Sequence, residues 1–465
     1  MMLCVVNNCG WAVFDFGTYK NEYTNIWLRS SEVLPEASAH DSPFLRLESH
    51  TGMRRIQFSF YIHYRIINMS LSQLDDVRIA IAEQVKFEVL THTQELDNEK
   101  ARHQITRSFI SDTLTVPSKE MYLYASMASL GDDVYYEPSA VALEAHMAKL
   151  TGKEAALFLP SGTMSNQIAL RTHLKQPPYA ILCDNRAHIY RYEAGGTAFH
   201  SGASTIAVSP TNGHHLTLAD VQANIVLDDN VAIAPVQVIA LENTLNGTIM
   251  PQEDAVAISD YAHSKGVKMH LDGARIWHVA METGISMSEL CKPFDSASMC
   301  FSKGLGAPIG SCLVGTKDFI KRARWFRKLF GGGMRQTSIL TASAAFALTH
   351  NFPRLEYVHG LTRKLANGMK ELGVNIITAE TCMVFFDPSS IGVTHAELAQ
   401  RAGALADPIL ISGNPRLVLH IQTSEEVVTD LLALIRTMAE EEKAAGYVSP
   451  AQTDEHRNGK GNIYR

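Results

Sequence analysis

The sequence of 465 residues contains no apolar run of 18 or more residues, no Cys-x-x-Cys pair and no dense block of basic residues. Without such an apolar run, we expect no membrane-spanning helix. The seven cysteines are scattered, which favours a reducing compartment over a disulfide framework. Lys and Arg number 41 against 48 Asp and Glu, a formal charge of −7, so nucleic acid is not an expected partner.

The N-terminal segment also lacks the features of a secretory signal. Residues 1–12 are mildly apolar, but they have no positively charged start and no convincing cleavage site follows them. We therefore expect a cytoplasmic protein, and we expect no metal site.

The chain divides by pattern into four parts. Residues 1–104 contain aromatic clusters and one helical stretch at 71–90 but no sustained period, and they suggest no role. Residues 105–360 are predicted to form a large domain, residues 361–447 a smaller domain, and residues 448–465 a polar tail. With 46% hydrophobic and 19% charged residues, the composition supplies enough apolar material for a sizeable core.

Short apolar runs alternate with amphipathic stretches from residue 105 onward. The apolar runs predict strands at 155–160, 179–184, 205–210, 236–243, 267–273 and 295–303. The amphipathic stretches predict helices at 137–152, 162–174, 252–266, 337–351 and 354–373. This alternation is typical of an α/β fold in which helices sandwich a mostly parallel sheet, followed here by a smaller C-terminal α/β domain.

Polar residues follow several predicted strands, and ligands bind at such strand ends in open parallel sheets. Ser161, Gly162 and Thr163 lead from the first strand into a helix. A glycine allows close approach, the helix N-terminus offers free N–H groups, and threonine adds a hydroxyl, so this segment could hold a phosphate. The same three residues also fit a plain helix cap, and they form neither a Walker loop nor a dinucleotide motif.

Charged residues follow three further predicted strands and one glycine-rich loop. Asp272 and Arg275 share a tight turn in "MHLDGARIWH", where an ordinary ion pair is the simplest reading. Lys303 follows a buried run among glycines; burial favours the neutral amine that forms Schiff bases, although a lysine reaching solvent fits as well. His188 follows a predicted strand, and Arg335 follows three glycines. Each of the two also fits the interpretation of an ordinary loop residue.

Together these groups fit the needs of one cofactor. Pyridoxal 5′-phosphate needs a lysine amine for its aldehyde, a cup and an arginine for its phosphate, and a carboxylate for its ring nitrogen. Lys303, the segment around Gly162 with Arg335, and Asp272 provide these groups.

The ordered motifs of residues 107–440 resemble the L-threonine aldolases among the fold-type-I pyridoxal-phosphate enzymes. The matching segments are "SDTLTVPS" at 111–118, "GDDVY" at 131–135, "GKEAALFLPSGTMSNQIALRTH" at 152–173, "AHIYRYEAGG" at 187–196, "LENTLNG" at 241–247, "HLDGARIW" at 270–277, "SKGLGAPIGS" at 302–311 and "FRKLFGGGMRQ" at 326–336. The resemblance implies cleavage of L-threonine or L-allo-threonine to glycine and acetaldehyde, within threonine breakdown or glycine formation. It also implies a homotetramer, a dimer of dimers with shared active sites.

The resemblance also implies roles for individual residues. Lys303 corresponds to the Schiff-base lysine, Asp272 to the partner of the ring nitrogen, and His188 to the histidine that stacks on the ring and assists catalysis. The coenzyme phosphate would be held by Ser161, Gly162, Thr163 and by Arg335 from a neighbouring subunit. The remaining matches imply that Ser111, Tyr135 and Arg416 contact the amino-acid substrate. Arg275 would contact either the coenzyme or the substrate.

Three departures from the family pattern keep one alternative open. Leu245 stands where many members have a histidine linked to the substrate hydroxyl, so His188 or a water must take that proton. The segment after Tyr135 is shorter than usual, and residues 1–104 have no counterpart. Some related enzymes are amino-acid racemases that break the Cα–H bond, and the lack of a histidine at Leu245 leaves that activity possible. A catalytically silent scaffold is disfavoured by Lys303, Asp272 and Arg335.

Overall fold

The computed structural model describes residues 2–7, 10–15, 71–87, 98–227 and 230–448. The chain forms two compact units, Met1–Gln94 and Glu95–Arg465. In the first, β1 (Met2–Asn7) pairs antiparallel with β2 (Gly10–Asp15), and α2 (Leu71–Val85) supplies the helix expected at 71–90. The predicted polar tail lies outside the described residues except for Val448. Among the described residues, no helix is both long and apolar enough to cross a membrane.

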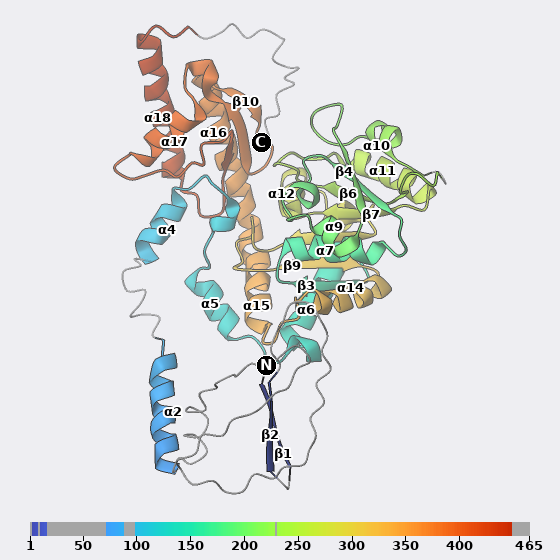
Figure 1. Cartoon of the computed structure of the whole chain (residues 1–465). Helices are drawn as coiled ribbons and strands as arrows, with labels where there is room; N and C mark the ends of the chain where they lie inside the picture. The colour runs from blue at the N-terminus through green and yellow to red at the C-terminus, as the bar shows by residue number, and fades with distance from the viewer. Residues whose placement is uncertain (1, 8–9, 16–70, 88–97, 228–229, 449–465) are drawn as a thin grey trace, which may run out of the picture. The chain divides into compact units, whose positions relative to one another are not determined.

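A seven-stranded sheet forms the centre of the second unit (Figure 1). Its strands lie in the order β3 (Ala155–Leu159), β9 (Ser311–Gly315), β8 (Ser296–Cys300), β7 (Lys268–Asp272), β6 (Val236–Glu242), β4 (Ala180–Asp184) and β5 (Ser204–Val208). The strands β8, β7, β6, β4 and β5 run parallel to one another, whereas β9 runs antiparallel to both β3 and β8. The mostly parallel sheet is confirmed, and β9 is a strand that the sequence analysis missed.

Helices cover both faces of this sheet because successive strand side chains point to opposite sides. On β3, Leu157 and Leu159 pack with α7 (Gly162–His173) and α14 (Lys317–Leu329), while Phe158 joins the core on the other face. That other face is covered by helices including α6 (Pro138–Thr151), α11 (Gln252–Ser264), α12 (Ile276–Thr283) and α13 (Met287–Cys291). The smaller helices of the unit are α5 (Lys119–Ser126), α8 (His188–Arg191), α9 (Gly196–Ser201) and α10 (Leu218–Asn224).

The sequence predicts a smaller C-terminal α/β domain, and the structure shows that its sheet is antiparallel. Its strands are β10 (Asn375–Thr378), β11 (Met383–Asp387) and β12 (Arg416–Val418), in that order. The helices leading to it and covering it are α15 (Ser338–Phe346), α16 (Leu355–Glu371), α17 (His395–Gly403) and α18 (Glu425–Ala444). The helix α4 (Asn98–Thr106) precedes Arg107, whose guanidinium bonds Asp407 and Asp430 of this domain.

The carboxyl ends of the parallel strands bring polar side chains into one row. Glu242 at the end of β6 pairs in register with Asp272 at the end of β7, and Asp272 pairs with Ser298 of β8. Lys303 follows β8 by three residues. The strand-end region therefore contains the carboxylate and the amine that the sequence singles out.

Candidate active site

Asp272 is held rigidly at the end of β7. Its carboxylate is buried and accepts hydrogen bonds from Asn166 Nδ2, at 2.7 Å, and from the backbone N–H of Ala274, at 3.1 Å. Asn166 lies on α7, and its Oδ1 is 3.1 Å from Nε2 of the buried His270. Two donors thus fix the orientation of a carboxylate that the sequence could place only at a strand end.

His188 lies beside this carboxylate and is oriented by a buried glutamate. Its Nδ1 is 2.8 Å from Oε1 of Glu193, whose side chain is fully buried, and its backbone N–H donates to Glu242 at 2.7 Å. A ring nitrogen of His188 and carboxylate oxygens of Glu193 and Asp272 lie within 4.8 Å of one another. With its Nδ1–H donated to Glu193, the histidine keeps Nε2 as a lone-pair acceptor.

Arg275 forms a buried bidentate ion pair. Its Nε and Nη2 donate to the two oxygens of Asp112, at 2.8 and 2.6 Å. Burial alone would raise the pKa of Asp112, but the Arg275 guanidinium holds that pKa well below its usual range. Asp112 lies 163 residues away in sequence, directly after Ser111. Arg275 therefore pairs with Asp112, and the simplest interpretation of the sequence, an ion pair with Asp272 on the same turn, is wrong.

Arg416 and Ser111 are brought to the same place by one strand. The N–H of Val418 in β12 donates to the carbonyl of Phe109 at 2.9 Å, which ties β12 to the segment carrying Ser111. Nε of Arg416 is buried without a hydrogen-bond partner in the described part of the chain. Burial lowers the pKa of Arg416, and the Arg275 charge nearby lowers it further. An unpaired, partly buried guanidinium is suited to binding an anion such as a carboxylate.

Lys303 lies half-buried in the loop after β8. The loop turns tightly there, because the N–H of Gly306 donates to the Lys303 carbonyl at 2.8 Å. The Lys303 ammonium lies within electrostatic range of the Asp112 and Glu242 side chains. The lysine thus faces the same row of strand ends as Asp272.

The segment from Ser161 to Thr163 begins α7 beside the end of β8. The Ser161 hydroxyl accepts the N–H of Met164 at 3.2 Å, so it does cap the helix. A Cβ at Gly162 would lie 2.6 Å from Sγ of Cys300, so a side chain there would force a shift. Ser161 and Thr163 are exposed. Capping by Ser161 leaves the N–H groups of Gly162 and Thr163 available to an anion.

Tyr135 and Arg335 lie on a separate, exposed patch. Tyr135 is 80% exposed, and the Arg335 side chain is 72% exposed with Nη1 3.2 Å from Asp132. The N–H of Asp133, in the short helix η2 (Asp133–Tyr135), donates to the Arg335 carbonyl at 2.9 Å, so the two predicted residues are neighbours.

Comparison with known proteins gives a consistent set of relatives. A sequence model of the beta-eliminating lyase family matches residues 108–389. The low specificity L-threonine aldolase of Saccharomyces cerevisiae is 46% identical over 322 residues, covering 68% of this chain and 82% of the relative. A probable low-specificity L-threonine aldolase of Schizosaccharomyces pombe is 40% identical over 342 residues, covering 73% and 89%. The chain belongs to the beta-eliminating lyase family and groups with its threonine aldolases.

Solved structures agree on the fold. The Leishmania major threonine aldolase matches with a TM-score of 0.61 at 17% identity, covering 71% of this chain and 99% of that one. A serine palmitoyltransferase of Sphingomonas wittichii matches with a TM-score of 0.55 at 17% identity, covering 72% and 88%. The fold expected from the resemblance to the fold-type-I pyridoxal-phosphate enzymes is therefore confirmed.

Glu242 is the residue of this lyase site that the strand-end rule should have found. It ends β6 beside Asp272 and binds the backbone of His188. Burial, and then the neighbouring charge of Asp272, raise the pKa of Glu242 to about 8. Asp112 and Asn166 were also missed, since their partners Arg275 and Asp272 are more than 100 residues away in sequence. Glu193 was missed as well, although it lies five residues after His188. The signal for Glu242 was its position at the end of an apolar run.

The raised pKa of Glu242 predicts a pH-dependent stability in the coenzyme-free protein. Between the ordinary glutamate pKa and about pH 8, the folded state keeps a proton that the unfolded state has lost, so stability falls as pH rises. Glu242→Gln should remove this fall. The difference in melting temperature, variant minus original protein, should increase from pH 5 to pH 8.5. The control Glu440→Gln, at an exposed site, should show a difference that does not change with pH. A constant difference for Glu242→Gln would contradict the prediction.

Proposed function

We propose that the protein is a pyridoxal-phosphate-dependent aldolase that cleaves L-threonine and L-allo-threonine to glycine and acetaldehyde. The observation that carries the proposal is the common location of Asp272, His188 and Lys303 at the strand ends of a chain 40–46% identical to proteins named threonine aldolases. The residues fit the coenzyme: an amine, a rigid buried carboxylate and a helix N-terminus with the free N–H groups of Gly162 and Thr163 meet the needs of its aldehyde, ring nitrogen and phosphate.

Each residue then has a distinct task. The bound coenzyme supplies an electron sink for the bond that breaks at Cα. Lys303 holds the coenzyme covalently, and Asp272, oriented by Asn166, stabilises the protonated ring nitrogen. Arg416, whose Nε lacks a partner, and Ser111 bind the substrate carboxylate, while Arg275 remains locked to Asp112 beside them. His188 Nε2, free because Nδ1 binds Glu193, takes the proton of the β-hydroxyl directly or through a water.

Racemisation of an amino acid such as alanine is the second candidate, and one feature favours it. Leu245, 5% exposed, offers no polar group for a substrate hydroxyl. Purified protein should be incubated separately with L-threonine, L-allo-threonine and L-alanine. The aldolase produces acetaldehyde and glycine from the first two, whereas D-alanine from the third identifies a racemase and rejects the proposal.

We further propose a homotetramer in which Arg335 and Tyr135 complete the active site of a second copy. The support is their high exposure within a region rich in exposed apolar side chains, namely Tyr122, Leu123, Met127, Leu130, Val134 and Tyr136. Such a concentration of exposed apolar side chains is characteristic of an interface.

Mixed assemblies test this shared site. Lys303→Ala and Arg335→Ala should each be nearly inactive alone. Refolding the two variants together should restore up to about a quarter of the activity, because some sites then combine the unchanged Lys303 of one copy with the unchanged Arg335 of the other. Mixing Lys303→Ala with a second lysine variant, Lys303→Gln, provides the control that restores nothing. No recovery in the first mixture would contradict the shared site.

A cytoplasmic location is also proposed. The five cysteines whose side chains the structure describes are free and buried. Unpaired thiols of this kind are typical of a reducing compartment.

A further inference from the structure

A chain of hydrogen-bonded side chains runs from the interior of the active site toward a surface cavity. Nδ1 of His278 on α12 is 2.8 Å from Nε2 of His359 on α16, and Nδ1 of His359 is 2.6 Å from Oε2 of Glu282. Both histidines are almost fully buried, at 1% and 2% exposed, while the Glu282 side chain is 31% exposed. The three groups thus connect a buried end to an accessible end.

The outer end opens into a cavity of about 250 Å³. Its lining includes Ile249, Glu282, His359, Arg363, Glu380 and Thr381. Nη1 of Arg363 is 3.0 Å from Oε1 and 3.2 Å from Oε2 of Glu282, so the guanidinium contacts both oxygens while Oε2 also binds His359. The cavity is partly polar and is large enough for several waters, which can accept or return a proton.

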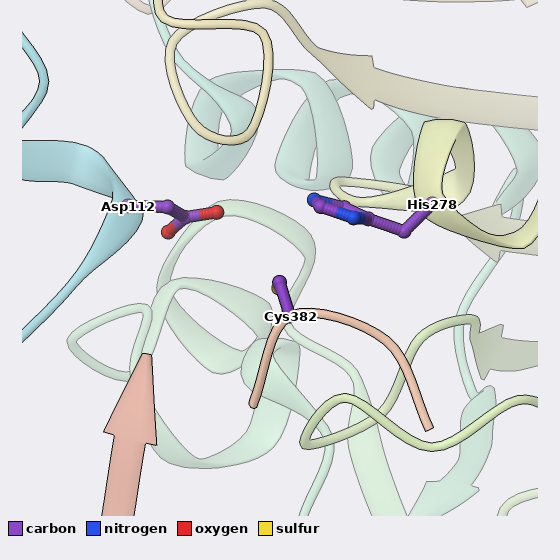
Figure 2. A group of neighbouring side chains, drawn as sticks. All are labelled: Asp112, His278 and Cys382. Atoms are coloured by element: carbon purple, nitrogen blue, oxygen red, sulfur yellow. The ribbon is translucent and has the colours of Figure 1, made fainter. Parts of the chain in front are cut away.

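The inner end lies against the groups of the active site. Figure 2 shows the edge of the His278 ring facing the Asp112 carboxylate, with Cys382 next to both, and the three ligand atoms lie within 4.8 Å of one another. Nε2 of His278 has no hydrogen-bond partner in the described part of the chain. A Cβ at Gly304 would lie 2.4 Å from Nε2, so the ring packs directly against the residue after Lys303.

The proton inventory of the chain sets its direction. An ionised Glu282 can only accept, so Nδ1 of His359 donates to it. Nε2 of a neutral His359 must then accept, so Nδ1 of His278 donates, and Nε2 of His278 is left as a bare lone pair facing Asp112. Burial, and then the neighbouring His359, lower the pKa of His278 to about 3, which keeps this ring neutral at rest. Every hydrogen bond in the chain therefore points outward.

A metal ion is a poor occupant of the same inner cluster. Both oxygens of Asp112 already bind Arg275, whose guanidinium would repel a cation placed there. Burial raises the pKa of the Cys382 thiol to about 12, so the sulfur stays protonated. Of the three candidate ligands, only the His278 lone pair is unengaged, and one imidazole does not make a metal site.

We propose that His278, His359 and Glu282 form a proton path between the active site and the cavity, and that this path removes the proton shed by an amino-acid substrate on binding. The inference rests on the proposed function. An amino acid arrives with an ammonium group, and its amine replaces the amine of Lys303. One proton is left over when neither amine keeps it. Nε2 of His278, whose lone pair has no partner in the described part of the chain, accepts this proton beside the Asp112 carboxylate, whose negative charge favours the charged ring.

Each transfer along the path balances. The proton bonds to Nε2 of His278, the Nδ1 proton of His278 moves to Nε2 of His359, and the Nδ1 proton of His359 moves to Glu282, which gives it to water in the cavity. All hydrogen bonds then point inward. When glycine leaves as a zwitterion, a proton returns by the reverse route and restores the resting tautomers. No ring has to rotate during the cycle.

The charged groups around the path favour this use. His278 on α12 faces Asp112, Arg275 and Cys382 in addition to His359. His359 faces Glu282 and Arg363. Burial lowers the pKa of His359 despite the attraction of Glu282, so this ring too stays neutral between transfers. These residues are positioned to move protons, and none of the three has to touch the substrate.

Proton release on mixing the coenzyme-loaded enzyme with glycine tests the path. Glycine has no Cβ, so it binds without cleavage. In weakly buffered solution, coenzyme absorbance reports binding, while a pH indicator reports the proton. The original protein should release about one proton per site as fast as glycine binds. In Glu282→Gln and in His359→Gln, binding should persist while proton release slows at least about tenfold, and added imidazole should restore it.

Matched controls separate the possible failures. Arg363→Gln breaks the ion pair to Glu282 without interrupting the path, so its proton release should be unchanged. The path would be overturned by any of three results. These are proton release as fast as binding in both path variants, no proton release in the original protein, and no rescue of the path variants by imidazole. Glu282→Gln lies near the surface and keeps the hydrogen-bond acceptor, which protects the test from misfolding. A lack of any absorbance change in the original protein would instead reject the proposed function.

Discussion

Replacement of Lys303 by alanine should abolish the visible absorbance of lysine-bound coenzyme and reduce aldehyde release by at least about a thousandfold. Lys303 lies at the strand-end row that contains Asp272 and Glu242, and no other lysine shares this position in the described part of the chain. Without its amine, the coenzyme can be held only by non-covalent contacts, and the exchange of one amine for another cannot occur.

An absorbance spectrum and an aldehyde assay of purified Lys303→Ala measure both effects. Lys292→Ala provides the control, since Lys292 is exposed and its ammonium is 3.6 Å from Glu289, away from the strand ends. Circular dichroism of the two variants shows whether each remains folded. If folded Lys303→Ala retained the band and full turnover, the assignment of this lysine would be wrong.

Replacement of Asp112 by asparagine should lower the free energy of unfolding by about 3–5 kcal/mol. Asp112 is fully buried and binds Arg275 through both oxygens, at 2.8 and 2.6 Å. Asparagine keeps the shape but leaves the guanidinium charge buried and unpaired, which is the costly half of breaking a buried ion pair. Urea unfolding at neutral pH measures the loss.

A second substitution shows whether the unpaired charge is the cause. Adding Arg275→Met to Asp112→Asn should recover at least about 1 kcal/mol, because the buried charge is then absent. Asp260→Asn, at an exposed position on α11, should change stability by less than about 0.5 kcal/mol. A loss in Asp112→Asn no larger than in Asp260→Asn would show that the pair is not stabilising as described.

The periodicity of the sequence was sufficient to predict most of the sheet and its ligand-binding edge. Apolar runs located β3 to β8, and the rule that ligands bind at carboxyl ends selected Asp272, Lys303 and the start of α7. The strand β9 was missed because "SCLVG" directly follows a turn-rich motif. Its antiparallel pairing depends on β3, more than 150 residues earlier, and no local pattern encodes that contact.

The contacts that orient the site could not be read from local patterns. Arg275 appeared to belong with Asp272, three residues away, but it binds Asp112. His278 and His359 are separated by 81 residues, and each alone resembles an ordinary helical histidine. Only Glu242 could have been found, since it ends an apolar run beside the predicted Asp272 strand. Long-range pairs of this kind arise from tertiary packing, which a single sequence does not reveal.

The central claim is tested most directly by the products formed from L-threonine. Purified full-length protein, loaded with pyridoxal 5′-phosphate, should convert L-threonine to glycine and acetaldehyde in equal amounts, and Lys303→Ala should form neither. L-Alanine should remain unchanged under the same conditions. Conversion of L-alanine to D-alanine without aldehyde from L-threonine would contradict the account.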